Sequence, residues 1–170
     1  MIDQYGRTIE YLRISVTDRC NLRCVYCMPE EGIEQLPHEQ MLTFEEIEKI
    51  CRISTELGIS KIKLTGGEPL VRKGLPDLLG KIKEIPGIEQ VTLTTNGILL
   101  KNQLDELMRQ GLDAVNISID TLDETCYHTV TRCGELNQAL EGLQAALEYP
   151  NLRVKLNCVP MNQSEEEYIR

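Results

Sequence analysis

Five short segments of this chain alternate apolar and polar residues, the pattern of a β-strand with one buried face. They cover residues 12–16, 62–65, 91–94, 115–120 and 152–157. Between them, apolar residues recur at helical spacing, which predicts helices at 44–57, 76–85, 104–108 and 135–147. Thr43 and Glu46 form a capping-box signal before the first helix, and Gly58 suits its end. This order predicts an α/β fold with a parallel sheet and right-handed crossovers.

The polar positions of the strands indicate a second, polar face of the sheet. A parallel sheet covered by helices on both faces has continuously apolar strands, whereas these strands are apolar on one face only. The polar positions carry Arg13, Ser15, Lys63, Thr65, Thr92, Thr94, Asn116, Ser118, Asp120, Arg153, Lys155 and Asn157. A curled sheet with outer helices would place this set in its concave interior, and the alternative is an open sheet with one face in water. Because charged and hydroxyl groups recur on every strand, we expect a polar cavity.

The composition limits the partners of this chain. Its 170 residues suit one well-buried domain. A net charge of −9, with no Trp and one Phe, disfavours a nucleic-acid surface, which is normally basic and supplied with aromatic side chains. No apolar run reaches bilayer length, and no charged and then apolar leader begins the chain. We therefore expect a cytoplasmic protein that binds neither nucleic acid nor membrane.

Three cysteines, Cys20, Cys24 and Cys27, follow the first predicted strand within eight residues. They lie in a connection of residues 17–42, which is longer than ordinary strand-to-helix connections and therefore indicates a functional loop. Iron–sulfur clusters normally take four Cys thiolates, so a set of three would leave one iron open to an exchangeable ligand. One alternative is a structural zinc site completed by His38 or a distant Cys. The other is a disulfide, which the odd total of seven cysteines disfavours.

Other candidate residues also follow predicted strands. Gly66-Gly67-Glu68-Pro69 comes after the second strand, Thr95-Asn96-Gly97 after the third and Asp120 after the fourth. In α/β folds, sites form at the carboxyl ends of the strands. A residue without a Cβ atom also allows a ligand to approach the backbone closely. We therefore expect these segments and the cysteines to form one site.

The cysteine and glycine motifs together resemble those of the radical S-adenosylmethionine (SAM) superfamily. Cys20, Cys24 and Cys27 have its CxxxCxxC spacing, Tyr26 takes the aromatic position before the last Cys, and the Gly-Gly-Glu-Pro segment matches its second motif. Further segments narrow the resemblance to the GTP 3′,8-cyclase family of molybdenum cofactor biosynthesis: 12–20, 27–29, 64–70, 93–97 and 116–120. The resemblance extends along nearly the whole chain, which corresponds to about the first half of a typical family member.

The resemblance implies a partial (βα) barrel of the radical SAM type. Residues 1–170 would form its core domain, incomplete at the C-terminus and truncated after the fifth parallel strand. It also implies that Cys20, Cys24 and Cys27 bind a [4Fe–4S] cluster whose open iron holds SAM. Reductive cleavage of SAM there yields a 5′-deoxyadenosyl radical. The residues that would contact SAM are Tyr26, Gly67 and Ser118.

The same resemblance implies GTP as the substrate. The positions that correspond to GTP contacts all lie on the polar face of the sheet: Arg13, Lys63, Thr94 and Lys155. Position 63 is usually Arg in the family, and a Lys keeps the positive charge for a phosphate but loses the planar fork of donors. The expected partners are an electron donor such as flavodoxin or ferredoxin and, in the full-length protein, a second copy in a homodimer.

Two parts of the family pattern lie outside these 170 residues. They are a second cluster on a C-terminal cysteine set and a C-terminal Gly-Gly tail. We therefore expect the N-terminal, cluster- and SAM-binding part of a cyclase, with no catalytic residue assigned. The alternatives are another single-cluster radical SAM enzyme and a catalytically silent fragment that keeps a cluster.

Overall fold

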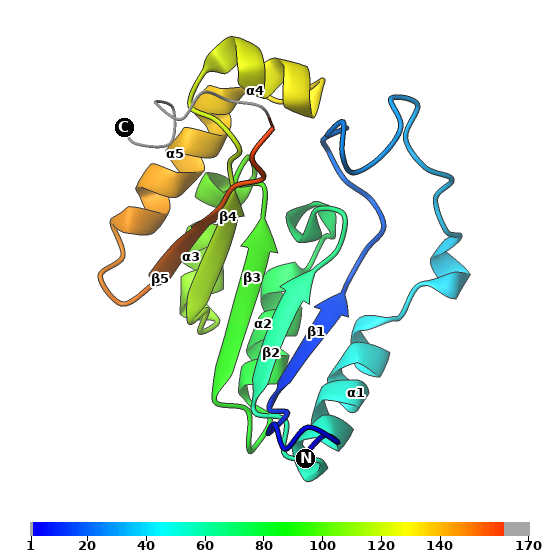
Figure 1. Ribbon diagram of the computed structural model, residues 1–170. Helices are drawn as coiled ribbons and strands as arrows, with labels where there is room; N and C mark the ends of the chain where they lie inside the picture. Colours follow the sequence, from blue (N-terminus) through cyan, green and yellow to red (C-terminus); the bar gives the residue numbers. More distant parts are fainter. Residues whose placement is uncertain (1, 162–170) are drawn as a thin grey trace.

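Five parallel strands form one sheet in the computed structural model, which describes residues 2–161 apart from the side chain of His38 (Figure 1). The strands are β1 (Tyr11–Ser15), β2 (Lys61–Thr65), β3 (Gln90–Thr95), β4 (Ala114–Ser118) and β5 (Arg153–Asn157). They lie side by side in chain order, and each neighbouring pair is parallel. The five predicted strands and the parallel sheet are therefore confirmed, with ends that differ by one or two residues.

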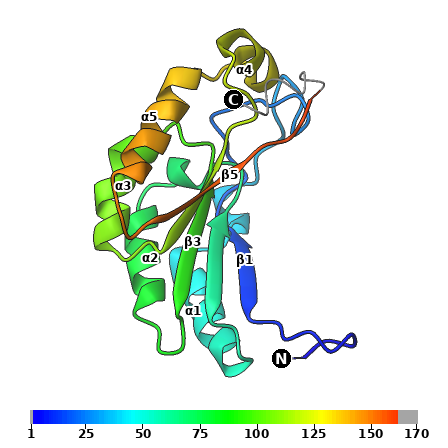
Figure 2. The same ribbon diagram turned by 60° about the vertical axis from the view of Figure 1, so that its left-hand side comes forward.

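The helices lie on one face of this sheet, as Figure 2 shows from the side. They are α1 (Phe44–Glu56), α2 (Leu75–Lys83), α3 (Leu100–Arg109) and α5 (Leu136–Leu147), while the short α4 (Glu124–Thr131) lies beyond the end of β4. Two single 3₁₀ turns, η1 (His38–Gln40) and η2 (Pro69–Val71), lie in the connections. Within the described residues, no helix has the length and apolar character needed to cross a membrane.

The first helix has the two ends that its sequence predicts. At its start the Glu46 N–H donates to Thr43 Oγ1 at 3.1 Å, and the Thr43 N–H donates to the Glu46 carboxylate at 2.8 Å. At its end Gly58 has a φ of +87°, and the Ile59 N–H donates to the carbonyl of Ser54 at 3.1 Å. These bonds satisfy backbone groups that a helix leaves unpaired, so they fix where α1 begins and ends.

The apolar face of the sheet and the helices enclose one hydrophobic core. In β2, Ile62 and Leu64 are fully buried, whereas Lys63 between them is partly exposed on the opposite face. Burial of each such aliphatic side chain contributes about 1.5–3 kcal/mol to folding. Cys51 is also completely buried in this core, where it acts as a small apolar residue. Of the helices that the structure describes, none covers the polar face (Figure 2).

The sequence prediction was incomplete between β4 and β5, where it gave one helix and the structure has two. The missing helix is α4, and it buries few residues, among them Tyr127 and Val130. Thr residues, which are weak helix formers, recur along it and blur any apolar period. Its start is nevertheless capped, because the Cys126 N–H donates to Asp123 Oδ1 at 2.7 Å.

Candidate cofactor and substrate site

The three clustered cysteines occupy the first part of the connection between β1 and α1, residues 17–42, which we call the cysteine loop. Cys24 and Cys27 lie in one turn, where the Cys27 N–H donates to the Cys24 carbonyl at 2.9 Å. The Leu22 N–H donates to Cys20 Sγ at 3.3 Å. All seven cysteines of the chain are free thiols.

The thiols of the cysteine loop influence one another electrostatically. The pKa of Cys24 is raised to about 11, mainly by burial and in smaller part by negative charge at Cys20, Asp120 and Cys27. The pKa of Cys20 is raised mainly by burial, with negative charge at Glu68 and Cys27 as smaller causes. Binding to cationic iron would relieve this repulsion between thiolates, which is the electrostatic situation of cluster ligands.

A single metal ion has no ready set of ligands in the described part of the chain. No group of three or more His, Cys, Asp or Glu side chains there is arranged to hold one. The side chain of His38, which the zinc alternative would use, lies outside the described part.

Helix α4, which the sequence prediction missed, anchors the cysteine loop. Two N–H groups that flank Cys24 donate to carbonyls in its last turn: Arg23 to Thr131 at 3.1 Å and Val25 to Val130 at 2.9 Å. The guanidinium of Arg132 donates to the carbonyls of Arg23 at 2.8 Å and Met28 at 3.0 Å, on either side of the cysteine turn. The segment between β4 and α5 therefore fixes the position of Cys24 and its neighbours.

The glycine pair at the end of β2 fits against the backbone of the same loop. A Cβ atom on Gly66 would lie 2.5 Å from the Thr17 carbonyl oxygen, and one on Gly67 would lie 2.4 Å from that of Arg19. The Gly67 N–H also donates to the Thr17 carbonyl at 2.8 Å. The sequence suggested close approach of a ligand, whereas the structure shows that the loop itself requires both glycines.

Glu68, which follows the glycines, is a buried carboxylate that joins three segments, and the sequence prediction did not assign it a role. It is 1% exposed and accepts hydrogen bonds from the Thr95 hydroxyl at 2.7 Å and the N–H groups of Asn96 at 2.7 Å and Leu70 at 3.0 Å. Burial raises its pKa, and these hydrogen bonds oppose the rise. Asn96 in turn donates to the side chain of Asn21 in the cysteine loop at 2.8 Å. The presence of Glu68 in the Gly-Gly-Glu-Pro motif was the sequence signal that could have pointed to this role.

Tyr26 connects the cysteine loop to the end of β4. Its hydroxyl donates to Asp120 Oδ2 at 2.7 Å, and burial and this bond raise the pKa of Tyr26. Asp120 lies two residues beyond Ser118, so Tyr26 and Ser118 are brought to one strand end. Gly67 lies at the end of β2, with β3 between the two places. The three predicted SAM contacts therefore all lie at the carboxyl edge of the sheet, near the ends of β2 and β4.

The four predicted GTP contacts lie on the polar face, in two rows that cross the strands. Arg13 is paired in register with Lys63, while Thr94, Asn116 and Lys155 form a second row nearer the carboxyl edge. The hydroxyl of Thr94 is buried and has no hydrogen-bond partner among residues 2–161. Within the same range, none of the three cations forms an ion pair with a carboxylate.

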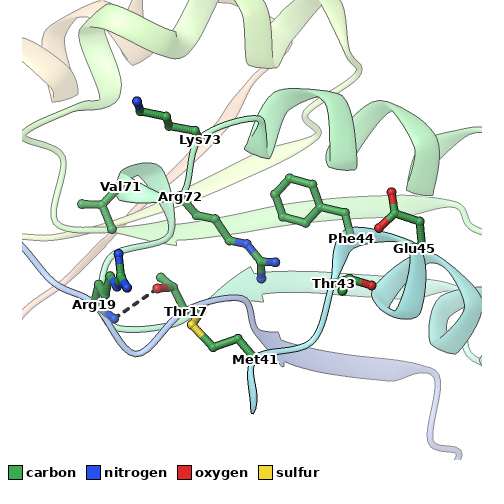
Figure 3. Close-up of a pocket in the computed structure, with 9 residues that line it drawn as sticks. All are labelled: Thr17, Arg19, Met41, Thr43, Phe44, Glu45, Val71, Arg72 and Lys73. Carbon is green, nitrogen blue, oxygen red and sulfur yellow. Dashed lines mark hydrogen bonds between the residues drawn. The ribbon is translucent and has the colours of Figure 1, made fainter. Parts of the chain in front are cut away.

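A separate cavity of about 590 Å³ lies outside these positions, between the base of the cysteine loop, the start of α1 and the segment after η2 (Figure 3). The side chain of Arg72 crosses it. Its guanidinium lies 4.3 Å from the Phe44 ring centre and donates to the carbonyls of Val16 and Leu42. Arg72 therefore ties the end of the cysteine loop to the end of β1, and no Cys lines this cavity.

Comparison with known protein families agrees with the motifs of the site. The model of the radical SAM superfamily matches residues 14–170. The chain belongs to the radical SAM superfamily, and membership implies an iron–sulfur cluster and SAM as cofactors.

Among curated proteins, the chain is similar to enzymes named GTP 3′,8-cyclase. The one from Petrotoga mobilis is 53% identical over 161 residues, which are 95% of this chain and 50% of that protein. The one from Pelotomaculum thermopropionicum is 52% identical over 169 residues, which are 99% of this chain and 52% of that protein. The chain thus spans about half the length of the curated relatives it matches.

Solved structures show the same fold at low sequence identity. SuiB of Streptococcus suis bound to S-adenosylmethionine has a TM-score of 0.77 at 22% identity, over 94% of this chain and 34% of that one. Methylornithine synthase (PylB) has a TM-score of 0.73 at 17% identity, over 94% and 47% of the two chains. These likenesses confirm the predicted α/β fold of the radical SAM type.

Proposed function

We propose that residues 1–170 are the N-terminal part of the core domain of a GTP 3′,8-cyclase that acts in molybdenum cofactor biosynthesis. The observation that carries this proposal is the identity of 52–53% with two proteins of that name over 95–99% of this chain. The positions of the predicted site residues in the fold support it further.

Cys20, Cys24 and Cys27 would hold a [4Fe–4S] cluster and leave one iron for SAM. When bound, the cluster and SAM supply a 5′-deoxyadenosyl radical by one-electron cleavage of the sulfonium. The protein supplies position, because the anchoring of the cysteine loop on α4 fixes the thiols before the metal arrives. Ligands that are held in position before the cofactor binds are what a demanding cofactor reaction needs.

SAM would lie at the carboxyl edge of the sheet, against the backbone at Tyr26 and Gly67 and the hydroxyl of Ser118. Support comes from the hydrogen bond between Tyr26 and Asp120, which holds Tyr26 at the strand end that carries Ser118. Glu68 holds the ends of β2 and β3 together beneath this edge and keeps Gly67 in place.

GTP would bind on the polar face, with Arg13, Lys63 and Lys155 attracting the triphosphate and Thr94 donating or accepting a hydrogen bond. Unpaired cations are notable on a protein of net charge −9, and a buried hydroxyl without a partner is normally satisfied by a ligand or water. Lys63 Nζ also lies 5.8 Å from the centre of the Tyr11 ring, which steadies its position on β2. A flavodoxin or ferredoxin electron donor, a homodimer of the full-length protein and a cytoplasmic location stay predictions.

Anaerobic reconstitution with iron and sulfide tests the proposal. We expect one [4Fe–4S] cluster per chain and slow cleavage of SAM to 5′-deoxyadenosine under strong reductant, measured by mass spectrometry. Because the chain spans half of its relatives, we expect it to form no cyclised GTP product alone and the full-length protein to form it. Tightly bound zinc without iron uptake, or SAM cleavage stimulated by a peptide and not by GTP, would contradict the proposal.

A matched pair of lysine variants tests the substrate face in the full-length protein. Lys155→Ala removes a cation from the polar face, and we expect roughly tenfold weaker GTP binding because a charge-assisted contact to phosphate is lost. Lys101→Ala is the control, since Lys101 lies on α3 and pairs with Glu141. Equal affinities of the two variants would place GTP elsewhere.

A further inference from the structure

The hydroxyl of Tyr127 is buried without a hydrogen-bond partner among the described residues. Tyr127 is 2% exposed, and its ring belongs to the hydrophobic core. An unsatisfied buried hydroxyl lowers stability, so a Phe at this position would be more stable. A native structure that keeps such a group normally has a use for it.

The ring of Tyr127 lies against the cysteine loop. A Cβ atom on Gly134 would be 3.0 Å from Tyr127 Cε1 and 2.8 Å from the side chain of Leu22, so the ring edge and the loop meet over Gly134. Tyr127 belongs to α4, whose last turn accepts the hydrogen bonds from Arg23 and Val25. The ring therefore lies beside the stretch of the loop that these two bonds join to α4.

Cys24 lies between Arg23 and Val25, whose N–H groups bond to Thr131 and Val130, and these two residues share one face of α4 with Tyr127. Burial is the main cause that raises the pKa of Tyr127, and negative charge at Cys24 is the next, ahead of Asp120 and Cys133. Asp120 already accepts bonds from Tyr26 and from the Val159 N–H at 2.9 Å. A metal-bound thiolate sulfur at position 24 would be a new acceptor beside the unpaired phenol.

We propose that Tyr127 is a positioning residue whose hydroxyl donates a hydrogen bond to Cys24 Sγ when the cluster is bound. The inference rests on the proposed function of Cys24 as a cluster ligand. Hydrogen bonds to the sulfur atoms of an iron–sulfur cluster favour the more negative, reduced state and so raise its reduction potential. Tyr127 would thereby make the cluster easier to reduce and hold Cys24 in one orientation.

The test compares Tyr127→Phe with the wild-type chain after anaerobic reconstitution. Phe keeps the ring and removes only the hydroxyl, so we expect unchanged iron content and a more negative potential in a redox titration followed by electron paramagnetic resonance. Tyr149→Phe is the control, because its hydroxyl binds Asp105 at 2.6 Å on the helical layer and should leave the potential unchanged. In resonance Raman spectra, an Fe–S(Cys) stretch should shift on deuteration in the wild type and in Tyr149→Phe. The same stretch should lose this shift in Tyr127→Phe.

A second variant covers the case in which Tyr127→Phe fails to assemble. Fluorotyrosine placed at position 127 keeps the shape of the side chain and makes the phenol a stronger donor, so the potential should rise. An unchanged potential in either loaded variant, or a wild-type Fe–S(Cys) stretch that does not respond to deuterium, overturns the inference and leaves the proposed function intact. Failure of the wild-type chain to take up iron would overturn both.

Discussion

The hydroxyl of Tyr26 donates a hydrogen bond to the carboxylate of Asp120 at 2.7 Å and joins segments 94 positions apart in the chain. Asp120 is buried, and its second carboxylate oxygen accepts the N–H of Val159 beyond β5 at 2.9 Å. One side chain therefore connects the cysteine loop with the ends of β4 and β5. Asp120 thereby ties the Tyr26 side chain to the sheet.

Removal of this bond should loosen the cysteine loop. Tyr26→Phe keeps the ring, and because Tyr26 is 46% exposed we expect only about 1 kcal/mol lower free energy of unfolding in urea, at the low end for a bond to a carboxylate. Amide hydrogen exchange in residues 20–28 should accelerate more than in α3. Tyr149→Phe serves as the control, and equal exchange in both variants would show that the bond does not hold the loop.

The assignment of Cys20, Cys24 and Cys27 as cluster ligands can be tested by substitution. Cys20→Ala, Cys24→Ala and Cys27→Ala should each abolish iron uptake in anaerobic reconstitution, because each removes one of three thiolate ligands. Cys51→Ala should keep full iron content and cost about 1–2 kcal/mol of stability, since Cys51 is completely buried in the core. Iron analysis and urea unfolding measure the two effects. Iron uptake by any of the first three variants, or loss of iron in Cys51→Ala, would show that other thiols ligate the cluster.

The strands could be predicted from the sequence because apolar residues on one face alternate with polar residues on the other. Lys63 between Ile62 and Leu64 shows the two-residue period directly, and the same parity places Lys155 on the polar face. The boundary signals of α1 were equally local, since Thr43 and Glu46 bond to each other. Patterns that depend on neighbours in the chain are visible before the fold is known.

The missed features depend on contacts between distant segments. Helix α4 has a weak apolar period, and its value lies in the bonds from Arg132 to the cysteine loop, more than 100 positions earlier in the chain. The need for Gly66 likewise comes from the Thr17 carbonyl, and the role of Glu68 comes from Thr95 and Asn96. No local period or spacing contains that information.

Lys63 offers a test of the substrate face in the full-length protein. Lys63→Arg should maintain or tighten GTP binding measured by calorimetry, because a guanidinium presents a planar fork of donors to a phosphate. Arg13 is the register partner of Lys63 on the neighbouring strand, so the guanidinium introduced at position 63 would lie beside Arg13 on the polar face. Lys101→Arg on α3 is the control. Severely weaker binding by Lys63→Arg would mean that Lys63 contacts something other than the triphosphate.

The buried carboxylate of Glu68 should give the stability a specific pH dependence. Its folded pKa is raised above the ordinary value of 4.5, so the protonated form is favoured by folding. The stability it contributes is therefore complete below about pH 4.5 and declines as the pH rises through the folded pKa. Glu68→Gln cannot ionise, so the difference in free energy of unfolding between wild type and variant should shrink as the pH rises.

Urea unfolding of both proteins from pH 4 to pH 8 measures this difference. Gln also replaces the carboxylate oxygen that accepts the Asn96 N–H with an NH₂ donor. The lost hydrogen bond lowers the free energy of unfolding by about 1–3 kcal/mol at every pH. A difference that grows with pH would show that hydrogen bonds outweigh burial at Glu68 and that its folded pKa is lowered.

Arg132 combines backbone strain with the anchoring of the cysteine loop, and substitution can separate the two. It is the one non-glycine residue within 2–161 with a positive φ, +64°, a conformation that costs an L-residue about 1–2 kcal/mol. Arg132→Gly relieves that strain but loses both bonds to the loop, so we expect stability within about 1 kcal/mol of wild type and faster loss of iron to a chelator. Arg132→Ala loses the same bonds and keeps the strain, so it should release iron at the same rate while being about 1 kcal/mol less stable than the Gly variant. Iron release at the wild-type rate from both variants would show that the cysteine turn holds its cluster without this arginine.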